Sequence, residues 1–105
     1  MTDMYGIDEE EMLLLQNIFS KTKNLEEVIL YGSRAKGNYK PFSDIDITLK
    51  GEHLCDDDLS DINYELSESS LPYFCNVSIY HRLNSPALID HINRRGKVVY
   101  RRTSQ

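Results

Sequence analysis

Two short segments set the strongest limits on how this chain folds. Residues 28–31, with the sequence Val-Ile-Leu-Tyr, form a continuous apolar run that ends at Gly32. An apolar run bounded by glycine predicts a central strand that is buried on both faces. Residues 44–49, by contrast, alternate strictly between polar and apolar side chains. This alternation predicts a second strand with one buried and one polar face, so we expect the chain to be built on a sheet.

Helical patterns surround these two strands. Asp8, followed three residues later by Glu11, predicts a capping box at the start of a helix. Ser85 and Pro86 predict the N-cap and first position of another helix, which ends at Gly96. The other expected elements are a short helical turn, a helix and two strands, at residues 33–37, 56–69, 73–80 and 97–101. Helices that alternate with strands around a small mixed sheet indicate an α/β (α+β) domain.

Length and composition restrict the class of protein. A chain of 105 residues fits a single domain, residues 1–105. No apolar run approaches the roughly 18 residues of a membrane span, and the acidic start of the sequence does not resemble a secretion signal. We therefore expect a cytoplasmic protein with no membrane partner, in which Cys55 and Cys75 are reduced and Cys75 is a core residue.

Charge is distributed unevenly along the chain. The net charge is −5, with 16 acidic and 6 basic residues in positions 1–70 against 1 and 6 in positions 71–105. The acidic majority argues against general nucleic-acid binding. The basic residues of positions 82–102 form either a solvated face or a surface for an acidic partner or a phosphate.

Asp44 and Asp46 are the first candidates for chemistry. In a strand their carboxylates share one face, roughly 6–7 Å apart along the chain. Two like charges this close repel each other, and a divalent cation removes the conflict. Mg²⁺ favours one or two carboxylates together with phosphate oxygens and waters. The alternative is an edge strand with a solvated polar face.

The Gly32–Ser33 pair points to phosphate binding. Glycine at the end of a buried strand allows a tight turn and the close approach of another group. If Ser33 opens a short helix, its N–H groups and hydroxyl can hold an anion, and Arg34 and Lys36 add positive charge nearby. A phosphate cradle beside a metal site is the arrangement that a nucleoside triphosphate with Mg²⁺ requires.

The segment from Gly32 to Asp46 resembles the signature of the DNA polymerase β-like nucleotidyltransferases, in particular their minimal, MNT-type branch. The matching residues, which include the ten-residue gap between Ser33 and Asp44, are Gly32, Ser33, Arg34, Gly37, Ser43, Asp44 and Asp46. Residues 71–80 and 88–100 resemble the family's third-strand segment and its closing helix and strand. The resemblance implies one minimal nucleotidyltransferase domain over the whole chain.

The resemblance also implies roles for single residues. Asp44 and Asp46 are expected to hold Mg²⁺ and to be catalytic. The residues expected to bind the nucleotide are Gly32, Ser33, Arg34, Lys36, Gly37 and Ser43. A third carboxylate would complete the metal site and help deprotonate the acceptor, and its position falls on Asn76. Asparagine can offer a neutral oxygen ligand but cannot act as a base. The alternatives are that the strand register is shifted, or that a carboxylate elsewhere, such as Glu65 or Asp61, fills the role.

Two functional hypotheses follow from the resemblance. In the first, the chain transfers AMP from ATP to an acceptor hydroxyl, which a HEPN-type toxin would supply as a tyrosine, and the chain acts as its antitoxin. In the second, Asn76 has disabled the chemistry and the domain binds a nucleotide or a toxin without turnover. A homodimer is a further option. Tyr31 and Tyr39 either stack on the base or pack in the core.

Overall fold

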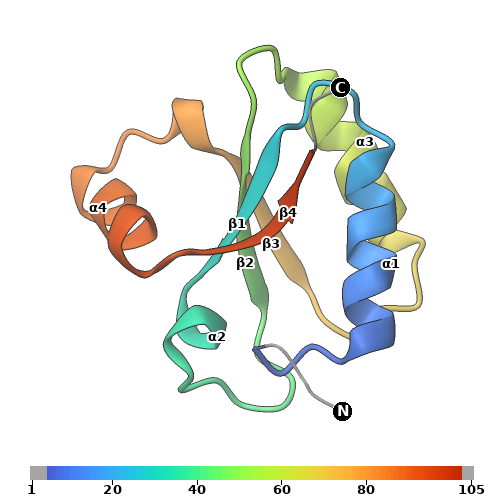
Figure 1. Ribbon diagram of the computed structural model, residues 1–105, viewed down its shortest axis with the longest axis vertical. Coiled ribbons are helices and arrows are strands. Elements are labelled where there is room, and N and C mark those ends of the chain that lie inside the picture. The colour runs from blue at the N-terminus through green and yellow to red at the C-terminus, as the bar shows by residue number, and fades with distance from the viewer. Residues whose placement is uncertain (1–4, 103–105) are drawn as a thin grey trace.

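The computed structural model describes residues 5–102 and shows a mixed four-stranded sheet between helices (Figure 1). The strands are β1 (Glu27–Tyr31), β2 (Ile45–Lys50), β3 (Cys75–Ile79) and β4 (Lys97–Arg101). Their order in the sheet is β3-β2-β1-β4. Strand β1 pairs antiparallel with β2 and β4, and β2 pairs parallel with β3. The expected mixed sheet, with the apolar run in a central strand, is confirmed.

The helices form a layer on each face of the sheet. They are α1 (Glu9–Ser20), α2 (Ser33–Lys36), α3 (Asp56–Ser67) and α4 (Pro86–Arg95), with a short 3₁₀ helix η1 (Tyr80–Arg82). Helices α1 and α3 cover one face, α4 lies on the other, and α2 sits at one end of the sheet (Figure 1). The predicted caps are present, because Asp8 and Glu11 form a capping box on α1 and the Ser85 hydroxyl accepts the Leu88 N–H on α4.

The main core fills the space between the sheet and the α1–α3 layer. Its α1 residues are spaced at helical intervals, so that one stripe of the helix is buried, and they are Met12, Leu15, Ile18 and Phe19. Leu30, Ile45 and Ile47 supply the sheet side of this core. On the other face, Ile29 and Ile92 are buried where α4 packs on β1. The α4 face keeps the polar side chains of β2 and β3, and the site is built there.

Two strand boundaries differ from the prediction. The segment expected at 73–80 pairs only as Cys75–Ile79, because the chain turns into η1 at Tyr80 on its way to α4. Asp44 lies just before β2 rather than within it, since the Ile45 N–H makes the first bond, to the Phe74 carbonyl.

Cys75, expected in the core, is only partly buried. Between residues 5 and 102, no helix is both long and apolar enough to cross a membrane.

The basic C-terminal segment is largely bound to the chain itself. Arg82 pairs with Asp56, and Arg101 pairs with Glu27 at 2.8 Å. The Arg102 guanidinium donates to the backbone carbonyls of Ser20, Thr22 and Leu25. These contacts attach η1 and the end of β4 to the acidic half of the molecule and use much of the positive charge internally.

Candidate functional site

Three polar side chains meet where β2 and β3 begin. The parallel register places Asp46 opposite Asn76. The Asn76 amide donates to Asp46 Oδ1 at 2.8 Å and to Asp44 Oδ2 at 3.4 Å. Asp44 and Asn76 are exposed, and Asp46 is half-buried. The predicted meeting of Asp44, Asp46 and position 76 on one face is therefore confirmed.

The Asn76 amide neutralises part of the repulsion between the two carboxylates. An amide NH₂ group carries two donors, and here both carboxylates accept from it. The same side chain has an acceptor oxygen, which can face a cation when the amide turns over. Position 76 is thus compatible with a cation at the two carboxylates, although it adds no charge.

No third carboxylate replaces the one that Asn76 lacks. Within residues 5–102, no group of three histidine, cysteine, aspartate or glutamate side chains is placed to hold a metal. Glu65 bonds to Lys21 at 3.2 Å on the far side of the sheet. Asp61 lies with Ile18 and Lys21 along the seam between α1 and α3. Neither alternative from the sequence reaches the site.

Gly32 lies directly against Asp46. Its φ of +82° belongs to the left-handed region, which glycine adopts without strain. A Cβ at this position would stand 2.4 Å from Asp46 Oδ2, far inside van der Waals contact. The turn after β1 and the Asp46 carboxylate can approach this closely only because residue 32 has no side chain.

The turn that follows Gly32 is a single helical turn. Ser33 begins α2 and is half-buried, Lys36 ends it and is exposed, and Gly37 caps it with φ +89°. The Gly37 N–H donates to the carbonyls of Ser33 and Arg34. The expected one-turn helix bounded by two glycines is confirmed, and it lies at the same end of the sheet as Asp44 and Asp46.

Arg34 does not share the exposed face of Asp44, and its expected contact with a nucleotide finds no support in its position. Its side chain is 1% exposed and points into the protein. The guanidinium donates to the backbone carbonyls of Tyr5, Pro41 and Ser43, at 2.8–3.3 Å. It also lies 4.5 Å from the ring centroid of Tyr73. A buried charge needs such partners, and here they attach the loop after α2 to Tyr73, just before β3, and to Tyr5.

Ser43 and Tyr39 add to the contacts around the buried Arg34 side chain. The Ser43 hydroxyl accepts the Lys40 N–H at 2.8 Å, which closes a turn just before Asp44. Tyr39 packs against the Arg34 guanidinium, 5.2 Å from its ring centroid. Both residues therefore help to shape the loop that carries Asp44, and a phosphate contact by Ser43 stays a prediction.

His91 is a residue of the site that the sequence did not reveal. Its Nε2 accepts the Gly32 N–H at 3.3 Å, and its ring lies edge-on to Tyr31 at 6.2 Å between centroids. Tyr31 pairs with Asp46 across the strands, and burial raises the pKa of its phenol, as does the Asp46 charge to a smaller extent. The position of His91 on an exposed-looking helix gave no signal, because only the fold brings α4 beside Gly32.

The donor set fits Mg²⁺. Two carboxylates and an amide oxygen are hard oxygen ligands, and Mg²⁺ in nucleotide sites takes one or two carboxylates and completes its shell with phosphate oxygens and waters. Gly32 places no side chain against the Asp46 carboxylate, whereas a Cβ there would meet Asp46 Oδ2. Asp44 and Asp46 are the residues that would hold the ion.

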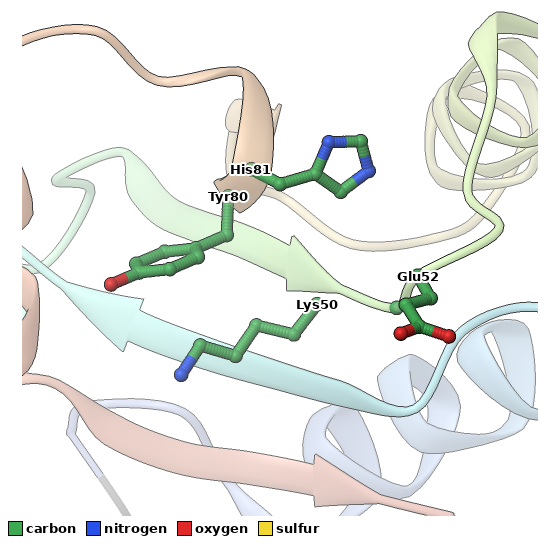
Figure 2. Close-up of a pocket in the computed structure, with 5 residues that line it drawn as sticks. Lys50, Glu52, Tyr80 and His81 are labelled. Atoms are coloured by element: carbon green, nitrogen blue, oxygen red, sulfur yellow. The ribbon is translucent and has the colours of Figure 1, made fainter.

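A surface cavity of about 280 Å³ lies elsewhere, at the opposite ends of β2 and β3. Figure 2 shows Lys50 and Tyr80 pointing together along the sheet, whereas Glu52 and His81 point away from them and from each other. The Lys50 Nζ sits 4.5 Å from the Tyr80 ring centroid and so covers that ring. These side chains do not converge on a common point, and the cavity is separate from the carboxylate site.

Comparison with known proteins identifies the family. The profile described as "Polymerase beta, Nucleotidyltransferase" matches residues 14–105. The chain belongs to the polymerase β nucleotidyltransferase family. The resemblance carried by the Gly32–Asp46 signature is therefore confirmed at the level of the family. No curated protein matches this nucleotidyltransferase chain significantly.

Solved structures share the nucleotidyltransferase fold. A chain of a toxin–antitoxin complex with AMP-PNP is 20% identical with a TM-score of 0.69, and the match covers 87% of this chain and 73% of that one. A candidate nucleotidyltransferase of Sulfolobus solfataricus is 25% identical with a TM-score of 0.54, over 87% and 77%. A chain of a complex between the tri-AMPylated Shewanella oneidensis HEPN toxin and an MNT antitoxin is 21% identical with a TM-score of 0.56, over 87% and 73%.

Proposed function

We propose that the chain is a Mg²⁺-dependent nucleotidyltransferase that moves a nucleoside monophosphate from a nucleoside triphosphate to an acceptor hydroxyl. The observation that carries this proposal is the convergence of Asp44 and Asp46 beside the Gly32 turn. Family membership supports the reaction class, and the oxygen donors support the metal. The Gly32 turn, proposed to hold phosphate, and the two carboxylates, proposed to hold the cation, lie at one end of the sheet.

The residues divide the work between them. Asp44 and Asp46 would hold the Mg²⁺, which would supply positive charge to offset that of the phosphates. Gly32 and Ser33 present backbone N–H groups and a hydroxyl to the β- and γ-phosphates. Lys36 lies exposed at the end of α2, where it adds positive charge, and Gly37 allows the turn to close.

The proposed nucleotide is ATP, and the proposed acceptor is a tyrosine of a HEPN-type partner protein, for which the chain would be an antitoxin. The support is the fold shared with chains from toxin–antitoxin complexes, one with AMP-PNP and one with an AMPylated HEPN toxin. A partner of this kind would bring its own hydroxyl to Asp44 and Asp46.

Asn76 favours a second candidate function. An amide cannot accept the proton of the acceptor hydroxyl, and none of the described carboxylates takes its place. The chain would then bind a nucleotide or a toxin at the same site and transfer nothing. The two functions predict the same nucleotide binding and differ in turnover.

A labelled-ATP assay separates the two functions. The purified chain, with Mg²⁺ and α-labelled ATP, is mixed with a co-expressed HEPN-type partner, and label on the partner is followed over time. The transferase predicts labelling by the wild type that Asp46→Asn abolishes. Wild type that binds AMP-PNP but labels nothing, together with Asn76→Asp that labels the partner, supports the binding module. Glu65→Gln, on the other face of the sheet, is the control and should match the wild type.

A further inference from the structure

His91 is the one titratable side chain that α4 brings to the turn after β1. Its Nε2 accepts the Gly32 N–H at 3.3 Å, and its ring rests against Tyr31. Gly32 in turn lies against Asp46 Oδ2. The imidazole is half-buried, so it is held by its neighbours and still reachable from solvent. None of the roles proposed above uses it.

The sheet order gives the site two sides. Asn76 lies on the β3 side of Asp46, and Gly32 lies on the β1 side. In phosphoryl transfer the attacking and leaving oxygens lie roughly in line on opposite sides of phosphorus. Position 76 is the expected acceptor side, so the leaving pyrophosphate belongs with Gly32 and Ser33. His91 is on that second side.

We propose that His91 binds the pyrophosphate end of the triphosphate and donates a proton to it as it leaves. This inference rests on the proposed nucleotidyl transfer and names a further residue of the same site. The Gly32 N–H is the point of exchange. A phosphate oxygen that accepts this N–H replaces the imidazole lone pair, and the protonated Nε2 can then donate to the same phosphate.

The proton and bond changes balance. A new bond forms between the acceptor oxygen and the α-phosphorus, and the bond from that phosphorus to the bridging oxygen breaks. The acceptor proton passes to water, and the His91 Nε2 proton passes to the departing pyrophosphate. Removing negative charge from a leaving group in this way is general acid catalysis, which contributes about 10²–10⁴-fold.

The surroundings of His91 include few other charges. On the strands packed beside it, the titratable groups are Tyr31 of β1 and, across Gly32, Asp46 of β2. On α4 itself, Asp90 and Arg94 form an ion pair, and Arg95 follows one turn after His91. Asn93 is uncharged and accepts from the Tyr80 hydroxyl.

Binding of inorganic pyrophosphate provides the first test, because it needs no acceptor. Calorimetry with Mg²⁺ at pH 6 and pH 8 compares the wild type with His91→Gln and with the control His81→Gln. The proposal predicts that the wild type and His81→Gln gain about tenfold more affinity on acidification than His91→Gln does. The pyrophosphate's own protonation affects all three proteins equally. Equal pH dependence in His91→Gln and wild type would overturn the proposal.

Transfer rates provide the second test, which a structural role would not pass. His91→Gln should lose about 100-fold in rate with ATP and much less with a β,γ-difluoromethylene analogue, whose leaving group is more acidic. An equal loss with both nucleotides contradicts proton donation. Wild type that fails to bind both pyrophosphate and AMP-PNP would overturn the nucleotide site as a whole. If the wild type binds and transfers normally and His91→Gln has the same affinity and rate, only the role of His91 is overturned.

Discussion

Arg34 and the Asp44–Asp46 pair come from one short signature and end in opposite environments. Arg34 is 1% exposed, and its donors are bound to backbone carbonyls. Asp44 and Asp46 remain accessible, with like charges held together by one amide. The Arg34 charge is satisfied inside the protein and fixes the loop, whereas the two aspartates keep negative charge at the surface. The difference shows that a charged residue in a functional signature can serve the shape of the site rather than its ligand.

The largest expected effect comes from removing the buried charge. Arg34→Met leaves the carbonyls of Tyr5, Pro41 and Ser43 without their donors. We therefore expect the free energy of unfolding to fall by about 3 kcal/mol. The matched control, Lys36→Met, removes the same charge from an exposed position and should change stability by less than about 0.5 kcal/mol. Urea denaturation measures both variants. Equal stability of Arg34→Met and Lys36→Met would show that the contacts of Arg34 do not stabilise the loop.

Gly32 and Gly37 give a second contrast, of moderate size. Both have positive φ, but a Cβ at Gly37 would meet nothing, whereas at Gly32 it would meet Asp46. Gly37→Ala should cost about 1 kcal/mol for the backbone alone, and Gly32→Ala about 2 kcal/mol. Thermal unfolding of the two variants gives the difference. Identical costs would mean that Asp46 moves aside freely.

Adding a third carboxylate at position 76 tests the Asp44–Asp46 pair directly. Asn76→Asp replaces two hydrogen bonds to Asp44 and Asp46 by like-charge repulsion. We expect Asn76→Asp to have a lower Tm than the wild type in EDTA. Millimolar Mg²⁺ should raise the Tm of the variant by more than it raises the Tm of the wild type. Asn63→Asp on α3 adds the same charge away from the site and serves as the control. A Tm that is insensitive to Mg²⁺ in Asn76→Asp would count against a metal site here.

The smallest effect concerns Cys75, which lies between the two regions. Burial first, and the nearby Asp44 charge second, raise the pKa of its thiol to about 11, and the Arg34 charge opposes them. At pH 8 only about one thiol in a thousand is then ionised. Iodoacetamide at pH 8 should modify exposed Cys55 first, as peptide mass spectrometry will show. Asp44→Asn should speed the modification of Cys75, and an unchanged rate would contradict the influence of that carboxylate.

The sequence predicted the elements whose signals are local. The apolar run before Gly32, the alternation after Asp44 and the caps at Asp8 and Ser85 each depend on neighbouring residues only, and the structure confirms them. The family resemblance implied that position 76 lies beside the two aspartates, and the strand register pairs Asn76 with Asp46. Family resemblance was needed to make that pair meaningful.

The sequence did not predict contacts that depend on distant segments. Arg34 looked like a phosphate ligand because its neighbours are Ser33 and Lys36, but its burial depends on how Tyr5 and Tyr73 fold around it. His91 gave no signal at all, since helical spacing does not show which strand a helix will cover. In both cases the decisive partner lies more than 25 residues away in the chain.

Calorimetric titration with AMP-PNP, with and without Mg²⁺, tests the central claim most directly. The wild type is compared with the Asp44→Asn, Asp46→Asn double variant, whose fold is checked by thermal unfolding. We predict Mg²⁺-dependent binding by the wild type, and loss of that binding in the folded double variant. Equal binding by both proteins, or wild-type binding that is indifferent to Mg²⁺, would show that the two carboxylates are not the nucleotide site.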